Sequence, residues 1–241
     1  MKKFLLLIPF ALFGEDIYAT FDVVPNREAG VSIAVSGLVK KVYTDVGYSV
    51  KKGQLLLELD NTDLQKSIEM SRADLDVMRE NLRYSKLQLD RYTKVKDVIS
   101  KDEFDRFEYD KNLKEKSIKQ VEASIEYKKS IINKSYIYAP FSGVVAAKMV
   151  ESGDVINPGQ KAFTIVDNRV RLIVNFDQQY WRDITNRCQY EYKVDGSSET
   201  KSLKLGRIYP TIDNKSRKAK AEIVTTGLRI GLFGDGYIKC K

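Results

Sequence analysis

The two cysteines, Cys188 and Cys240, are the side chains of this 241-residue chain with the greatest capacity for covalent chemistry. Both lie in its C-terminal part, and two thiols in one small domain can pair in an oxidising compartment. We therefore hypothesise a Cys188–Cys240 disulfide, with two buried thiols as the alternative. Neither reading makes the cysteines a reaction centre.

Histidine is absent from the chain. Its absence removes the commonest metal ligand and general base, and it excludes Ser-His-Asp and Cys-His catalytic sites. Metal export would need methionine ligands, yet after the initiator only Met70, Met78 and Met149 exist, the first two of them in or beside a helical seam. We expect no catalytic residue, no metal and no cofactor, and hence a protein that is not an enzyme.

Glycines mark a sequence repeat around which the chain is organised. Each member of the second set lies 106 residues after its counterpart, since Gly37, Gly47 and Gly53 recur as Gly143, Gly153 and Gly159. Apolar residues flank these glycines, so each half is predicted to form a strand, a turn and a second strand, and glycine allows the positive φ that tight turns need. Because neither half can bury its apolar face alone, we expect the halves to pack into a small β-sandwich.

The insertion between the two halves has the pattern of two long helices. Capping residues at 61–63 precede apolar residues at alternating steps of three and four, which are the a and d positions of a heptad. The predicted first seam is Leu64, Ile68, Ser71, Leu75, Met78, Leu82, Ser85, Leu89 and Tyr92. The returning seam is Phe104, Phe107, Lys111, Lys114, Ile118, Val121, Ile125, Lys128 and Ile132. We expect the three lysines to lay their stems along the partner helix and keep the ammonium groups in water.

A short turn between helices of similar length predicts an antiparallel hairpin. A helix from about Thr62 to Val98 would be roughly 55 Å long, more than a globular core needs. Ser100 and Glu103 form a capping box for the second helix. Residues 60–135 hold 17 basic and 16 acidic side chains, the balanced surface typical of a coiled coil. Such a hairpin returns the chain to its starting point, so the split β-domain can close.

Residues 47–60 and 138–145, with the sequences GYSVKKGQLLLELD and YAPFSGVV, resemble the two parts of a split lipoyl/biotinyl carrier domain. This split domain is found in the periplasmic adaptor subunits (membrane fusion proteins) of bacterial tripartite efflux pumps of the RND type. In a true carrier, the hairpin between the halves presents an acylated lysine, whereas Asp63 occupies that position here. A lipoyl or biotinyl carrier is therefore the disfavoured alternative.

The resemblance implies an elongated, multidomain α+β protein. It consists of an antiparallel α-helical coiled-coil hairpin inserted in a split lipoyl/biotinyl-like β-sandwich and followed by a β-barrel domain, which residues 206–213 and 216–222 resemble. The expected domains are a removed signal peptide (1–19), the lipoyl-like β-domain (31–60 plus 136–166), the hairpin (61–135) and the β-barrel domain (20–30 plus 167–241). The membrane-proximal domain of longer members is expected to be absent or vestigial.

The N-terminus and the charge distribution predict a location. Met1–Lys3 and the ten apolar residues Phe4–Phe13 form a charged and then an apolar region too short to span a bilayer, which is typical of a secretory signal. Cleavage is expected after Gly14 or Ala19, and a retained signal anchor is the alternative. Residues 167–241 hold 15 basic against 9 acidic side chains, a surplus that suits anionic lipid or an acidic partner surface; nucleic acid is not an expected partner.

By resemblance, the protein links an inner-membrane efflux transporter to an outer-membrane channel and exports drugs or other toxic small molecules. It is expected in the periplasm, associated with the inner membrane, as a homo-oligomer in the form of a trimer or hexameric ring. The residues that would bind the channel at the hairpin tip are Arg91, Val95, Ile99, Ser100 and Lys101, with Val95 in place of the family's leucine. The candidates for facing the transporter are Lys215, Arg217 and Lys218.

Two other interpretations stay open. Arg91 can be an ordinary solvated helix charge and Ser100 simply a helix cap. The chain can also be an adaptor of an ATP-driven protein or macrolide exporter, a class that normally has a membrane-spanning N-terminus and longer hairpins.

Overall fold

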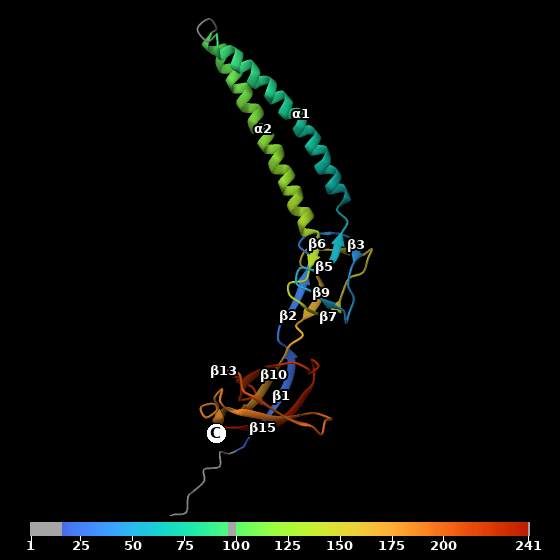
Figure 1. Cartoon of the computed structure of the whole chain (residues 1–241), viewed down its shortest axis with the longest axis vertical. Helices are drawn as coiled ribbons and strands as arrows, with labels where there is room; N and C mark the ends of the chain where they lie inside the picture. Colours follow the sequence, from blue (N-terminus) through green and yellow to red (C-terminus); the bar gives the residue numbers. More distant parts are fainter. Residues whose placement is uncertain (1–15, 96–99, 241) are drawn as a thin grey trace, which may run out of the picture. The chain divides into compact units, whose positions relative to one another are not determined.

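The computed structural model describes residues 16–95 and 100–240, which divide into two compact units (Figure 1). One unit comprises Gly30–Phe141 and Val145–Thr164, and the other comprises the remainder of the described chain. The strands in chain order are β1 (Ile17–Pro25), β2 (Glu28–Ser32), β3 (Gly37–Val42), β4 (Ser49–Val50), β5 (Leu55–Leu59), β6 (Tyr136–Tyr138), β7 (Gly143–Lys148), β8 (Val155–Ile156), β9 (Lys161–Val166), β10 (Val170–Asp177), β11 (Gln189–Val194), β12 (Thr200–Lys204), β13 (Arg207–Ile212), β14 (Lys218–Thr225) and β15 (Phe233–Lys239). The helices are α1 (Thr62–Thr93), α2 (Lys101–Lys134) and the short 3₁₀ helix η2 (Gln178–Tyr180).

The repeat forms two four-stranded sheets with equivalent strand orders. One has the order β2-β9-β7-β4 and the other β6-β5-β3-β8. The first half of the repeat supplies β3, β4 and β5, and the second half supplies β7, β8 and β9. The short middle strand of each half is exchanged, because β4 joins the sheet of β7 and β9 while β8 joins the sheet of β3 and β5. Neither sheet is complete without both halves.

The hydrogen bonds obey the same internal symmetry. The amide of Gly47 donates to the carbonyl of Val145 at 2.9 Å, and the amide of Gly153 donates to the carbonyl of Val39 at 2.8 Å. Each partner in the second bond lies 106 residues from its counterpart in the first. The two halves therefore close on each other through reciprocal main-chain bonds.

The six repeat glycines serve two different purposes. Four of them have φ between 79° and 96°, which L side chains rarely adopt: Gly47, Gly53, Gly153 and Gly159. Gly37 and Gly143 were wrongly predicted as turn glycines, since they begin strands β3 and β7 without a positive φ. A Cβ on Gly143 would lie 2.1 Å from the carbonyl oxygen of Val166, so a side chain is excluded there by close backbone packing.

The helices α1 and α2 run antiparallel, side by side (Figure 1). Every residue of the two predicted seams is buried or half-buried, and the core of the pair is Ile68, Leu75, Ile118 and Ile125. At its last described turn α1 ends at Thr93 rather than at Val98, so it has 32 residues and is about 48 Å long. The heptad pattern thus identified the buried face along the whole pair.

A buried amide holds the base of the hairpin. The predicted capping residue Asn61 precedes α1, but its side chain makes no cap bond. Instead its Nδ2 donates to Ser135 Oγ at 2.8 Å and to Tyr136 Oη at 3.1 Å, while Gln65 Nε2 donates to its Oδ1 at 2.6 Å. The Asp60 carboxylate accepts from the amide and hydroxyl of Thr62 at the start of the helix. The first and last residues of the insertion are therefore fastened to each other, next to the paired strands β5 and β6.

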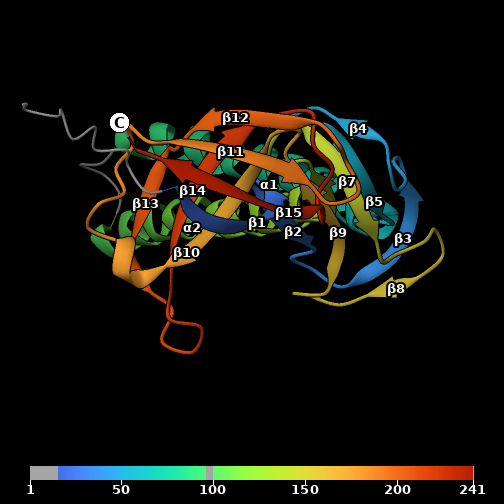
Figure 2. The same cartoon turned by 90° about the horizontal axis from the view of Figure 1, so that it is seen from below.

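The remaining strands form a seven-stranded antiparallel sheet with the order β12-β11-β15-β1-β10-β14-β13; Figure 2 shows β12, β11 and β15 side by side. This sheet occupies the region predicted as the barrel domain, and β12 and β13 are its first and last strands. It starts at Ile17, three residues before the predicted boundary, because Ile17 and Ala19 are buried in its core. Cleavage after Ala19 would remove those residues, whereas cleavage after Gly14 keeps the strand whole.

The predicted disulfide is present in the same unit, where the sulfurs of Cys188 and Cys240 are bonded at 2.02 Å.

Candidate functional site

The tip of the helix pair is built from the last turn of α1 and the first turn of α2. Tyr92 stacks on Phe107 across the pair, with ring centroids 4.1 Å apart and planes at 17°. Ser100 adopts an extended conformation and its Oγ accepts from the amide of Glu103 at 3.2 Å, so it caps α2. The aromatic stack closes the last layer of the seam and gives the tip a fixed base.

The predicted tip residues that the structure describes all face solvent. Arg91, Ser100 and Lys101 are exposed, and Val95 is 45% exposed. Within residues 16–95 and 100–240, the Arg91 guanidinium makes no hydrogen bond or ion pair. Ile99 lies outside the described residues. A cation, a valine and a hydroxyl on solvent-facing turns can bind another protein, but they form no arrangement for catalysis.

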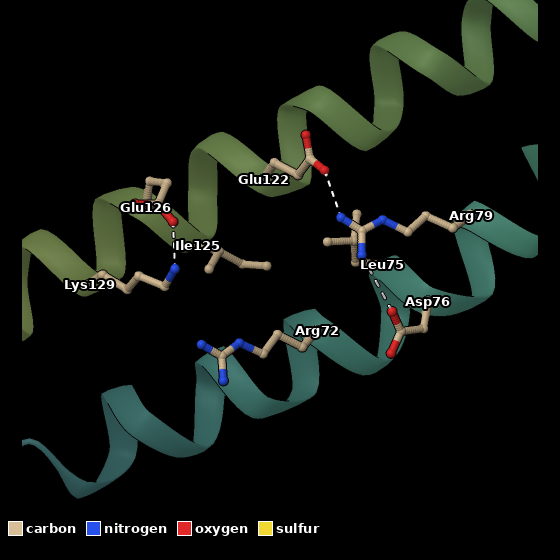
Figure 3. Close-up of a pocket in the computed structure, with 8 residues that line it drawn as sticks. All are labelled: Arg72, Leu75, Asp76, Arg79, Glu122, Ile125, Glu126 and Lys129. Carbon is tan, nitrogen blue, oxygen red and sulfur yellow. Dashed lines mark hydrogen bonds and ion pairs between the residues drawn. The ribbon is translucent and has the colours of Figure 1, made fainter.

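One long side of the helix pair is charged. Arg79 Nη2 lies 2.9 Å from Glu122 Oε1, and Lys86 Nζ lies 3.0 Å from Glu115 Oε1, so ion pairs bridge the two helices. Figure 3 shows the groove beside the Arg79–Glu122 bridge, with Arg72 extending into it. The Glu115 carboxyl has its pKa held below the usual range by the Lys86 ammonium.

Two of the three seam lysines form hydrogen bonds across the helix pair with their ammonium groups, whereas Lys111 pairs with Glu115 on its own helix at 3.4 Å. Lys128 Nζ donates to Ser67 Oγ at 2.8 Å and to Ser71 Oγ at 3.0 Å on the other helix. Lys114 Nζ likewise bonds Ser85 across the pair and the Asp110 carboxylate, which lowers the pKa of that carboxyl. The small hydroxyl side chains of α1 leave room for these ammonium groups inside the seam. Such polar layers favour one register of the pair.

The opposite side of the helix pair exposes apolar residues. They recur at spacings of seven or fourteen residues: Met70, Val77 and Tyr84 on α1, and Leu113 and Tyr127 on α2, each between 49% and 70% exposed. Between the two rows runs a shallow groove whose lining includes Ser71, Asn81 and Ser124. We call this surface the weakly charged face, because its middle part contains few ionic side chains. Seam counting alone did not single it out, although the seven-residue spacing is visible in the sequence.

The basic candidates lie close together and exposed, Lys215 and Arg217 on the turn between β13 and β14 and Lys218 at the first position of β14. Asp213 organises the turn, since its carboxylate accepts from the amides of Lys215 and Ser216 at 3.0 and 2.8 Å. These bonds lower the pKa of the Asp213 carboxyl and keep it ionised. The three cationic side chains are thus held on one ordered loop.

Among the residues that the structure describes, no cluster of three or more His, Cys, Asp or Glu side chains could hold a metal ion. No helix there has both the length and the hydropathy needed to cross a membrane.

Comparison with known proteins identifies a family and a fold. Residues 27–167 match the family described as CzcB-like, barrel-sandwich hybrid domain. The chain is 32% identical over 135 residues to the membrane fusion protein MtrC of Neisseria gonorrhoeae, a match that covers 55% of this chain and 33% of MtrC. An uncharacterised protein of Haemophilus influenzae is 30% identical over 143 residues, covering 59% of this chain and 34% of that protein. The matches therefore span about a third of the length of these two curated relatives.

The fold also resembles a solved structure. The crystal structure of MacA from Actinobacillus actinomycetemcomitans superposes with a TM-score of 0.78 and 20% identity, over 92% of this chain and 78% of that chain. At this identity the likeness concerns the fold alone. It covers both units of the chain, because the unmatched share is small.

Proposed function

This chain belongs to the family of proteins with a CzcB-like barrel-sandwich hybrid domain, and we propose that it is a periplasmic adaptor linking an inner-membrane efflux transporter to an outer-membrane channel. The observation that carries the proposal is the hairpin, which leaves the β-domain after β5 and returns at β6 with an exposed tip at its far end. Its cargo would be drugs or other toxic small molecules. The disulfide suits an oxidising compartment such as the periplasm.

The finer domain descriptions belong to the same proposal. The two exchanged four-stranded sheets would be the lipoyl-like part of the adaptor, and the seven-stranded sheet the counterpart of its β-barrel. Asp63 lies in the first turn of α1 rather than in a hairpin loop, which argues against a carrier that presents an acylated lysine there. The protein would act through binding and not through catalysis.

Deleting the gene tests the proposed function. The deletion strain should accumulate fluorescent efflux substrates, and wild-type protein expressed from a plasmid should restore their export. The secreted proteins of the same strain should stay unchanged, which separates small-molecule export from the alternative of a protein exporter. Unchanged accumulation together with a depleted secretome would favour that alternative.

We further propose that several copies associate, as a trimer or hexameric ring, through the weakly charged face of the helix pair. Exposed apolar rows on both helices are unusual for a solvated surface, and a second copy would cover them. Val77→Arg should lower the molar mass measured by multi-angle light scattering. The exchange Arg83→Gln on the charged side is the matched control and should leave the mass unchanged.

The exposed turn at 213–218 is proposed to face the transporter. Replacing Lys215, Arg217 and Lys218 with glutamate should reduce the transporter recovered with the adaptor by about tenfold or more, because complementary charges steer such contacts. Co-purification from detergent-solubilised membranes measures it. Glutamates at the exposed positions Lys51, Lys116 and Lys119 change the net charge equally and should leave recovery unchanged; equal recovery with both variants would contradict this assignment.

A further inference from the structure

One end of the seven-stranded sheet gathers features that the adaptor function does not explain. The register pairs Asp177 with Lys218 and Ile17 with Ile238, so the end of β10 lies beside the starts of β14 and β1 and near the end of β15. The segment Gln178–Cys188 extends from this end, next to the basic turn at 213–218. We call it the end segment.

The end segment is held in place at several points. Asp177 Oδ1 accepts from the amide of Gln179 at 2.9 Å and caps the 3₁₀ helix. Ile184 is buried in the core of the sheet. The disulfide ties Cys188 to Cys240. The segment therefore presents its exposed side chains from a fixed backbone.

Trp181, the single tryptophan of the chain, lies on the end segment. Its Nε1 donates to the carbonyl of Tyr209 at 3.1 Å, yet the side chain stays 37% exposed. The one polar atom of the indole is thus already satisfied, and the part that faces solvent is apolar ring. Exposed tryptophan of this kind is enriched where proteins meet the interface of a membrane with water.

Basic side chains surround Trp181. Arg182 and Arg187 are exposed on the same segment, and Lys215, Arg217 and Lys218 lie on the adjacent turn. The acidic groups at this end are Asp177, Asp183 and Asp213, together with Asp16, which lies 3.8 Å from the ammonium group of Lys239. Basic groups outnumber acidic ones, so an anionic surface is electrostatically favoured.

The sequence places an apolar stretch close to the same end. Asp16 is the first described residue, and β1 begins directly after it at Ile17. Phe4–Phe13 precede Asp16 by only a few residues in the chain. Where that stretch is retained as a signal anchor, this end of the sheet lies within a few residues of the membrane.

We propose that the end segment is a membrane-surface contact that binds anionic phospholipid headgroups through Arg182 and Arg187 and places Trp181 at the interface. The inference rests on the proposed location beside the inner membrane, but its test uses only protein and lipid. The neighbouring turn remains available to the transporter, which is embedded in the same membrane.

Purified full-length protein and lipid vesicles test the contact. With excitation selective for tryptophan, vesicles containing phosphatidylglycerol should shift Trp181 emission to shorter wavelength, and brominated acyl chains should quench it. Vesicles of phosphatidylcholine alone should do neither, and added salt should weaken the effect. Arg182→Gln with Arg187→Gln should weaken binding to anionic vesicles by about 25-fold, at roughly fivefold for each cation.

Two controls keep the result specific. Lys116→Gln with Lys119→Gln removes the same charge from α2 and should bind as the wild type does. Trp181→Ala should reduce co-sedimentation with anionic vesicles while the disulfide still forms. Equal binding to both kinds of vesicle, or equal loss in the α2 control, would overturn the proposal. So would unchanged vesicle binding by the arginine variant together with loss of the transporter in co-purification, which would make the segment a protein contact and leave the adaptor function standing.

Discussion

Replacing Arg91 with glutamate should abolish efflux while leaving the fold intact. Arg91 is exposed on the last full turn of α1, and among the described residues its guanidinium has no partner within the chain. Reversing its charge breaks no ion pair among the described residues and costs about 1 kcal/mol through the dipole of α1, in whose last turn Arg91 lies, but it places an anion where the proposed channel contact needs a cation. Drug susceptibility of cells carrying this variant should equal that of the deletion strain.

A cation far from the tip provides the comparison for Arg91. Lys116→Glu reverses an exposed cation on α2, away from the tip, and should keep wild-type resistance. Both variants should unfold within a few degrees of the wild-type temperature, measured by circular dichroism. Wild-type resistance in cells with Arg91→Glu would refute the assignment of the tip.

Removing the disulfide should cost the largest share of stability. Cys188 and Cys240 are 52 residues apart in sequence. Closing a loop of that length lowers the conformational entropy of the unfolded chain, which raises its free energy by about 4 kcal/mol at room temperature. Cys188→Ala with Cys240→Ala should therefore lower the free energy of unfolding of the seven-stranded unit by about that amount. Urea denaturation followed by Trp181 fluorescence measures it, because Trp181 lies in that unit.

Reduction of the wild-type protein separates the cross-link from packing. Cys188 is buried, so the alanine variant also loses some apolar contact. Wild-type protein kept in reducing buffer has both sulfurs and no cross-link, and it should unfold close to the midpoint of the variant. If the oxidised and reduced proteins unfold at the same urea concentration, the bond does not stabilise this unit.

The parts of the fold that could be predicted from the sequence are those that follow from a regular spacing of residues. The heptad steps identified the buried face of α1 and α2, because burial along a helix repeats with its turns. The glycine spacing identified two equivalent halves, because Gly47 and Gly153 need the same positive φ at the same point of each turn. The first pattern involves residues one helical turn apart, and the second is a short spacing of glycines that recurs later in the sequence.

Features that depend on the meeting of distant segments were missed or misread. The exchange of β4 and β8 follows from pairing between the halves. Asn61 looked like a helix cap, but its partner Ser135 lies 74 residues away. Gly143 looked like a turn residue, although its constraint comes from the backbone of Val166. The spacing of residues within one element does not show which distant segments will come into contact.

In the candidate sites too, features set by nearby residues were predicted and features set by distant contacts were missed. The tip residue Ser100 was identifiable as a helix cap from its spacing to Glu103. Trp181 was passed over, because its contact with Tyr209 depends on the sheet order, in which β14 separates β13 from β10. The seven-residue spacing of Val77 and Tyr84 was visible in the sequence, but their exposure could be recognised only once the seam had been placed.

Crosslinking in intact cells tests the central claim most directly, namely that one chain contacts two different membrane proteins, one through the hairpin tip and the other through the turn after β13. A photoreactive amino acid at position 95, on the hairpin tip, should capture an outer-membrane channel, and one at position 215, on the turn after β13, should capture an inner-membrane transporter. Mass spectrometry of the crosslinked bands identifies each partner. Capture of the same protein from both positions, or capture of a channel from position 215, would contradict the account.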